Sequence, residues 1–299
     1  MPLPWNRGLD NMMNQINKNK LTPYLFLAPA LILFLIFTVY PIISSFILSF
    51  QTSQGGTYVF TGLDNYIRLI KDTTFHQALF NTFIIFIVQV PIMILLALML
   101  AAFLNSKLLK FKGLFRTGFF LPAVTSLVAY SILFSIILMD KGILNQALNV
   151  FGIDSIPWLN DPFWAKVSII IAMTWRWTGY NMVIYLAAMQ NISEETYEAA
   201  SIDGAGKVRQ FFSITIPQLK PIILFTSIIS TISTLQLFDE PFNLTKGGPG
   251  DATTTLGLMI YDNGFKYYDF SYASAIAYVI VVIVAILSLI QSKVTGDGK

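Results

Sequence analysis

Six long apolar stretches restrict the fold of this chain more than any other feature. A helix needs roughly 20 mainly apolar residues to cross the hydrocarbon core of a bilayer, and there it satisfies its own backbone hydrogen bonds. The stretches that reach this length lie at residues 23–50, 77–104, 114–139, 163–190, 218–240 and 271–291. The sequence therefore predicts an all-α polytopic membrane protein with six transmembrane helices.

Composition supports this fold class and excludes several kinds of site. Charged residues make up 12% of the chain, about half of the ~25% usual in soluble domains. There is no cysteine to form disulfides or thiolate ligands, and the single histidine, His76, cannot by itself form a metal site or a Ser/His/Asp triad. The glycine-rich run at 247–250 lacks the spacing of a phosphate-binding loop. We therefore expect no catalytic residue, metal or cofactor in this chain, and no nucleic-acid partner.

Basic residues predict the orientation in the membrane. With the six stretches as spans, twelve Lys and Arg residues lie on the side that carries both termini and the loop at 191–217, and six lie on the other. The side richer in Lys and Arg is normally cytoplasmic. We therefore expect a cytoplasmic or interfacial segment at 1–22, a transmembrane domain at 23–292 that includes this loop, and a cytoplasmic tail at 293–299.

The loop at 191–217 has the sequence features of two short helices. Ser193 is a suitable N-cap residue, and the acidic residues that follow it favour the start of a helix over about 194–203. Gly204 or Gly206 can end that helix. A second helix is predicted from residue 207 to about 214, so the loop forms a helix–turn–helix that lies parallel to the membrane and outside it.

One short pattern in this loop resembles a known family. Glu198-Ala199-Ala200 is followed, two residues later, by Asp203-Gly204-Ala205-Gly206, and this resembles the EAA loop of permeases in binding-protein-dependent ABC importers. Ser193 is a departure, since the family often has proline there. Further similar landmarks lie at residues 81–82, 119–122, 179–182, 238–239 and 244–249. The resemblance covers residues 25–291 and is greatest to the carbohydrate-uptake branch, the maltose-type and glycerol-phosphate-type permeases.

This resemblance implies a type I ABC importer permease fold, with six helices and both termini in the cytoplasm. It also implies that the loop is a coupling helix, inserted into a cleft on an ATPase subunit. The residues that it assigns to this contact are Glu198, Ala199, Ala200, Asp203, Gly204, Ala205 and Gly206. The implied partners are a second, non-identical permease, two ATP-binding subunits that hold ATP and Mg²⁺, an extracellular solute-binding protein, and the lipid of a bacterial or archaeal plasma (inner) membrane.

The fourth apolar stretch contains a candidate for the substrate path. Arg176 lies well inside this stretch, and a charge within a membrane usually faces a cavity or a partner. Met173, Trp177 and Tyr180 share a helical face with it, and aromatic rings beside hydrogen-bond donors suit a sugar. The alternative is that Arg176 extends to the headgroups, with Trp175 and Trp177 as interfacial anchors.

The third and fifth stretches add further candidates for the same path. The residues are Ser233, Thr234 and Leu237 in the fifth stretch, with Ser126 and Tyr130 in the third. The alternative is that such polar side chains only join helices to one another. Asp239 and Glu240, near the outer end of the fifth stretch, are predicted to contact the binding protein or to stabilise the outer loop.

Together these features predict a permease subunit of an ATP-driven sugar importer, with an oligosaccharide as the expected cargo. One alternative is the same machine importing glycerol phosphate or its diesters, although a phosphate favours more cations than Arg176 alone. An alternative from another class is a secondary transporter driven by an ion gradient. Such a transporter is expected to show inverted repeats or carboxylates within the membrane, and the sequence shows neither.

Overall fold

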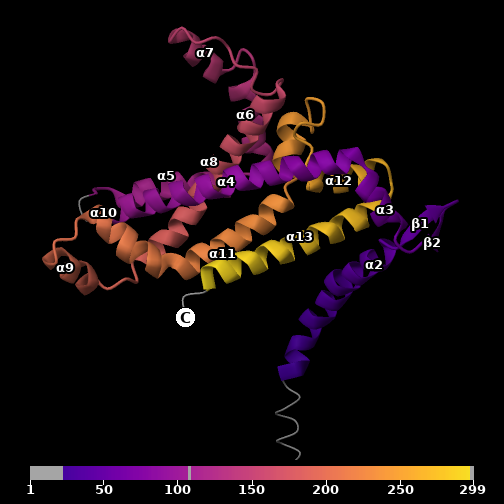
Figure 1. Ribbon diagram of the computed structural model, residues 1–299, viewed down its shortest axis with the longest axis horizontal. Coiled ribbons are helices and arrows are strands. Elements are labelled where there is room, and N and C mark those ends of the chain that lie inside the picture. The colour runs from indigo at the N-terminus through magenta and orange to yellow at the C-terminus, as the bar shows by residue number, and fades with distance from the viewer. Residues whose placement is uncertain (1–22, 107–108, 297–299) are drawn as a thin grey trace, which may run out of the picture.

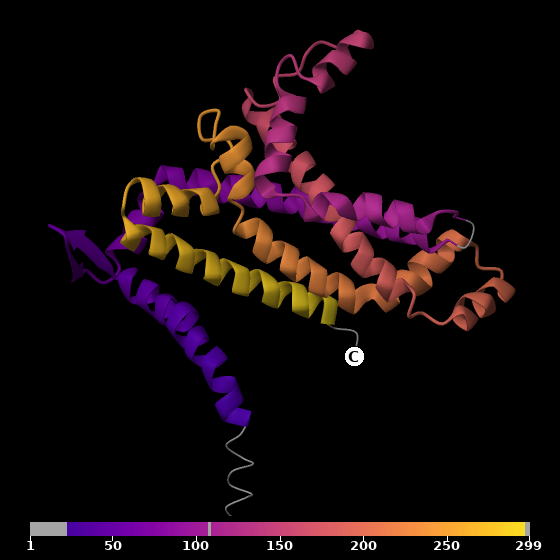
Figure 2. The same cartoon turned by 180° about the vertical axis from the view of Figure 1, so that it is seen from behind.

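The computed structural model describes residues 23–106 and 109–296, and this part of the chain is mostly helical. The predicted segment at 1–22 and residues 297–299 of the predicted tail lie outside the described residues. Five helices form the elongated body of the molecule (Figures 1 and 2). They are α4 (Thr73–Asn105), α5 (Lys112–Val124), α8 (Pro162–Met189), α11 (Ile216–Leu235) and α13 (Phe270–Gly296).

Helix α4 is the central element of this body, and it packs against α8, α11 and α5. Its Ala97 and Ala101 are fully buried and share one apolar cluster with Met182 and Tyr185 of α8 and Leu219 of α11. Small side chains let helix backbones approach closely, as is common between helices in membranes. This packing fixes which faces of α4, α8 and α11 are left to enclose a cavity.

The crossing of α5 and α8 is closer still. A Cβ atom placed on Gly179 of α8 would lie 1.7 Å from the carbonyl oxygen of Phe119 in α5. Real Cβ atoms essentially never approach a neighbour within 3.0 Å, so the crossing requires glycine. This contact holds the part of α8 that contributes to the cavity.

The first helix lies apart from this body. It runs from Pro23 to Leu48, includes the π-helical turn η1 (Leu35–Val39) and α2 (Tyr40–Leu48), and contributes no buried residue. Figure 1 shows it directed away from the other helices. Its C-terminal end reaches α13, where the rings of Phe46 and Tyr278 meet edge to face with their centroids 5.0 Å apart.

A short hairpin and three small helical elements occupy the end of the body at which the first helix arrives (Figure 1). Strands β1 (Gln51–Gln54) and β2 (Thr57–Phe60) pair antiparallel, and α3 (Asp64–Lys71) follows them. The other two are α12 (Leu256–Tyr261) and the π-helical turn η4 (Asp262–Lys266). Arg68 of α3 forms a 2.7 Å ion pair with Asp269, which ties this end of the molecule to the start of α13.

The outer loop between α11 and α12, which includes the π-helical turn η3 (Pro241–Thr245), is held against α4. The side-chain amide of Asn81 donates to the carbonyl oxygens of Asp251 and Thr254, both at 2.9 Å. Asn81 is fully buried, and its bond to Thr254 is buried as well. The two bonds together hold the loop against α4.

Five described helical segments are long and apolar enough to cross a membrane. They are Pro23–Leu48, Thr73–Asn105, Leu127–Val150, Lys207–Leu235 and Phe270–Val294. Helix α8 has the length of a span but is less apolar, since it carries Lys166, Arg176 and several polar residues. The number of six spanning helices therefore stays a prediction.

The predicted third stretch, 114–139, is not one helix. Helix α5 ends at Val124 and the next begins at residue 127, because Thr125 and Ser126 have extended backbone conformations. Pro122 lies just before this break and has no N–H to donate to the preceding turn. Beyond the break lie α6 (Leu127–Leu138) and α7 (Ile143–Val150), which Figure 1 shows projecting from the body.

Candidate functional site

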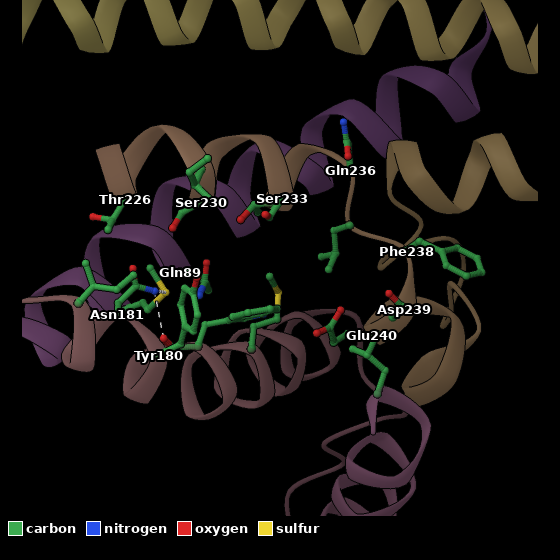
Figure 3. A pocket seen from close by; sticks show the side chains of 18 of the residues that line it. Gln89, Tyr180, Asn181, Thr226, Ser230, Ser233, Gln236, Phe238, Asp239 and Glu240 are labelled. Carbon is green, nitrogen blue, oxygen red and sulfur yellow. Dashed lines mark hydrogen bonds between the residues drawn. The ribbon is translucent and has the colours of Figure 1, made fainter. Parts of the chain in front are cut away.

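A cavity of about 330 Å³ lies among α4, α8, α11 and the segment that follows α11 (Figure 3). Its volume is within the range of ~300–1,000 Å³ that is usual for small-molecule sites. Neutral polar side chains, aromatic rings and two carboxylates line it. The polar and aromatic lining residues are Gln89, Trp177, Tyr180, Asn181, Phe225, Thr226, Ser230, Ser233, Thr234, Gln236, Phe238, Asp239 and Glu240.

Helix α8 contributes one face to this cavity. Met173, Trp177 and Tyr180 all line it, and their spacing of three and four residues explains why they share that face. The rings of Trp177 and Tyr180 are edge to face, with an interplanar angle of 87°. Asn181 lies beside them and donates its side-chain N–H to the carbonyl oxygen of Trp177 at 3.1 Å. The face therefore combines two aromatic rings with an amide.

Helix α11 contributes hydroxyl groups on the opposite side (Figure 3). Ser230, Ser233 and Thr234 line the cavity in the last turns of this helix. The helix ends at Leu235, and the chain then turns so that Leu237 also lines the cavity. Its carbonyl oxygen accepts a 2.5 Å hydrogen bond from the hydroxyl of Thr255, which fixes the turn.

Arg176 does not line the cavity, although it was predicted with the substrate path. Its side chain is 6% exposed, and its guanidinium carbon lies 4.7 Å from the ring centroid of Tyr130 and 5.4 Å from that of Trp177. Its Nε and Nη1 atoms have no hydrogen-bond partner among the described residues. The alternative interpretation expected Arg176 to extend outward to the headgroups. In this structure its side chain is instead buried.

The other two candidates from the third stretch have different positions. Tyr130 lies one contact away from the cavity, because its hydroxyl donates to the carboxylate of Glu240, which does line it. Ser126 is exposed at the start of α6 and is not among the lining residues. The structure thus brings six of the nine predicted path residues to the cavity: Met173, Trp177, Tyr180, Ser233, Thr234 and Leu237.

Several lining residues were not predicted from the sequence. Gln89 and Asn181 are buried polar residues within apolar stretches, and such residues usually face the interior of a helix bundle, which was a usable signal. Asp239 and Glu240 were instead expected to contact the binding protein or to stabilise the outer loop. Both line the cavity, because the chain leaves α11 at Leu235 and turns inward.

The predicted coupling loop forms α9 (Glu194–Ile202), close to the predicted bounds. Gly204 has φ +80°, and the N–H groups of Gly204 and Ala205 donate to the carbonyl oxygens of Ser201 and Ala200. These two bonds form a Schellman motif, which needs glycine at the left-handed position. Ser193 has the N-cap position, but its side chain makes no capping bond within the described structure.

Helix α9 is attached to the helix that follows it. The hydroxyls of Tyr197 and Thr215 are 2.8 Å apart, and the side-chain amide of Gln210 donates to Ser201 and to the carbonyl oxygen of Ala205. Glu198, Ala199, Asp203, Gly204 and Gly206 are exposed, and Ala200 and Ala205 are half-buried. The loop is thus a rigid unit with an open outer surface.

The second helix of the loop differs from the prediction. Helix α10 (Lys207–Gln210) and the π-helical turn η2 (Phe211–Thr215) run directly into α11, so residues 207–235 form one helix of 29 residues. Pro217 does not end it, because it directly follows the π-helical turn η2, where the regular i→i−4 bonding is already replaced and a residue without an N–H is tolerated. One continuous helix therefore connects the turn after α9 to Ser230, Ser233 and Thr234 in the cavity (Figure 1).

Comparison with known proteins identifies relatives along nearly the whole chain. The family model described as "Binding-protein-dependent transport system inner membrane component" matches residues 74–293. The lactose transport system permease LacF of Rhizobium radiobacter is 55% identical, over 92% of this chain and 94% of that protein. The arabinooligosaccharides transport system permease AraP of Bacillus subtilis is 38% identical, over 100% and 96%.

The fold is also shared with a solved structure. A chain of a bacterial alginate ABC transporter, crystallised in complex with an alginate pentasaccharide-bound periplasmic protein, superposes with a TM-score of 0.83. The match covers 93% of this chain and 95% of that one, at 24% sequence identity. The resemblance inferred from the EAA-like loop is thereby confirmed. This multi-pass membrane protein belongs to the inner-membrane components of binding-protein-dependent ABC transport systems.

Proposed function

We propose that this chain is one permease subunit of an ATP-driven importer that carries an oligosaccharide across a bacterial inner membrane. Two relatives with high coverage are named for lactose and for arabinooligosaccharides, which are both carbohydrates. The cavity suits such a cargo. Its hydroxyl and amide groups can exchange hydrogen bonds with sugar hydroxyls, and the rings of Trp177 and Tyr180 can pack against the C–H face of a sugar ring.

The continuous helix at 207–235 carries the proposal. It joins the turn after α9 to the hydroxyl groups of the cavity, so a displacement of α9 can be transmitted along one helix to Ser230, Ser233 and Thr234. Helix α9 presents Glu198, Ala199 and Asp203 outward, where an ATPase subunit can contact them. In this proposal ATP-driven closure of the ATPases moves α9 and switches the cavity between the two sides of the membrane.

The remaining parts of the machine follow from this role. Two ATPase subunits would hold ATP and Mg²⁺, a second, non-identical permease would form the other half of the pathway, and a solute-binding protein would deliver the sugar. The proposed topology has six spanning helices, with α8 as the sixth, and places both termini and α9 in the cytoplasm. A periplasmic protein is present in the complex of the structurally similar alginate transporter.

The test is a charge reversal on α9. The wild type, Glu198→Lys and the control Asp154→Lys are each expressed with the neighbouring operon proteins, purified and reconstituted in liposomes. Asp154 is exposed in the segment after α7, far along the chain from α9, so its reversal changes charge without touching the loop. ATPase activity is then measured with the binding protein and lactose, an arabino-oligosaccharide or a glycerol phosphodiester.

We expect the wild type and Asp154→Lys to show ATPase activity that rises with the loaded binding protein. Glu198→Lys is expected to reduce that stimulation at least about tenfold. The lysine would present a positive charge to the surface of the ATPase subunit that is proposed to bind the Glu198 carboxylate. Stimulation by a sugar supports the carbohydrate cargo, whereas stimulation by the phosphodiester alone contradicts it. Unchanged stimulation in Glu198→Lys contradicts the coupling role.

A further inference from the structure

The charges around the cavity have one sign. Asp239 and Glu240 both line it, and Figure 3 shows them on the segment that follows α11. No Lys, Arg or His is present among the described residues of the lining. Every other polar lining residue is a neutral amide, hydroxyl or indole group. A cargo in this cavity therefore meets carboxylates and neutral groups.

The nearest cation is shielded from the cargo. The guanidinium of Arg176 lies against the rings of Tyr130 and Trp177, and Trp177, not Arg176, forms the cavity wall. Arg176 offsets part of the negative charge from behind this wall. It has no direct contact through which it could pair with an acidic group on the cargo.

Glu240 is held in place as an acceptor. Its side chain is 4% exposed, and its carboxylate accepts a hydrogen bond from the hydroxyl of Tyr130. A carboxylate has about four acceptor sites, so one such bond leaves others free. Sugar hydroxyls can donate to these free sites, whereas a carboxylate or phosphate on the cargo cannot. The half-buried carboxylate of Asp239, which also lines the cavity, repels a negative charge on the cargo.

We propose that Asp239 and Glu240 make this cavity selective for uncharged carbohydrates and exclude acidic ones, such as uronates, aldonates and sugar phosphates. The inference rests on the proposed function, since it assumes that the cavity receives the sugar. It assigns to the permease a selectivity that is separate from that of the binding protein. The two carboxylates are specificity-determining residues in this account.

The test compares two ligands that differ in one group. Lactitol and lactobionate both derive from lactose, with the glucose at the reducing end converted to an open chain. Carbon 1 of that chain is a CH₂OH group in lactitol and a carboxylate in lactobionate. Their dissociation constants are measured with the purified transporter complex in nanodiscs by saturation-transfer NMR, which detects weak binding. The binding protein is left out, so its own preference does not enter. The proteins compared are the wild type, the double variant Asp239→Asn/Glu240→Gln and the control Asp154→Asn.

We expect the wild type to bind lactitol at least about tenfold more tightly than lactobionate, because repulsion between adjacent like charges is worth that much or more. The double variant should reduce this ratio by at least about tenfold, since its amides keep the shape but remove the charge. Asp154→Asn should keep the wild-type ratio. A general loss of folding lowers both affinities and leaves the ratio unaltered, so the ratio reports charge selection.

Three results would overturn the inference and leave the proposed function standing. The first is equal binding of the two ligands by the wild type, and the second is an unaltered ratio in the double variant. The third is tighter binding of lactobionate, which would show that Arg176 reaches the cargo. If neither compound binds the wild-type complex, the sugar site of the proposed function is contradicted, and the inference fails with it.

Discussion

Replacing Gly179 with alanine tests whether the close crossing of α5 and α8 positions the cavity wall. The added methyl group would lie 1.7 Å from the carbonyl oxygen of Phe119 and 2.5 Å from its carbonyl carbon. To restore the 3.0 Å that real Cβ atoms keep, the oxygen must move by at least 1.3 Å. Because the neighbour is backbone, a rotamer change cannot relieve the clash, and one helix must shift against the other.

The expected cost follows from this geometry. Overpacking in a core costs about 1–3 kcal/mol when side chains can adjust, and a backbone clash belongs at the upper end of that range. Alanine in a helix gains about 0.5–1 kcal/mol over glycine, which offsets a part. We therefore expect Gly179→Ala to lower the free energy of unfolding by about 2 kcal/mol. It should also weaken sugar binding, because Trp177 and Tyr180 flank this position.

Gly118→Ala is the matched control. Gly118 is exposed in α5, and no described atom lies within 4 Å of the place where its Cβ would be. The same substitution there should be neutral or raise stability by about 0.5–1 kcal/mol. Unfolding is measured by titrating the purified protein in mixed micelles with dodecyl sulfate, and sugar binding by the NMR assay described above. If both variants are equally stable, the helices do not cross as closely as the structure shows.

Three further predictions concern one backbone conformation and two sets of buried hydrogen bonds. Gly204→Ala should destabilise α9 by about 1 kcal/mol and lower sugar-stimulated ATPase activity, because Gly204 has φ +80°. Thr226→Val should lower the free energy of unfolding by about 1–3 kcal/mol, because it leaves the buried Tyr185 hydroxyl without its 2.6 Å partner. Tyr185→Phe should cost less, because Thr226 then keeps its bond within α11. Unfolding titrations of the two variants measure the difference. Asn145→Ala should expose the loop at 140–160 to limited proteolysis, because the Asn145 side chain bonds the backbone of Ile156 and the indole N–H of Trp158.

The sequence predicted best what depends on local chemistry. The bounds of α9 and its end at Gly204 follow from acidic residues in a first turn and from the conformational freedom of glycine. The shared face of Met173, Trp177 and Tyr180 follows from the helical repeat. These signals depend on neighbours in sequence, so no tertiary information is needed to interpret them.

The missed features depend on tertiary structure. The inward turn after Leu235, which brings Asp239 and Glu240 to the cavity, is fixed by a hydrogen bond from Thr255, and no pattern within residues 218–240 indicates it. The break in the helix at 125–126 lies within an apolar run. Hydropathy does not depend on backbone conformation, so it does not indicate this break. The continuity of α10, η2 and α11 was not predicted, because a proline such as Pro217 is common in the first turn of a new helix.

Cysteine labelling tests whether the sugar passes through the cavity between α8 and α11. The chain has no cysteine, so one introduced at Ser233 is its only thiol. Ser53→Cys, on the exposed hairpin, is the control. The rate of labelling by a small hydrophilic methanethiosulfonate is measured in the assembled, transport-competent complex, with and without saturating lactose.

If the sugar occupies this cavity, lactose should slow the labelling of Ser233→Cys several-fold and leave the labelling of Ser53→Cys unchanged. A sugar in the cavity would cover Ser233, which lines it, and would not reach the hairpin. Equal labelling rates of Ser233→Cys with and without the sugar, in a complex that imports that sugar, would contradict the account.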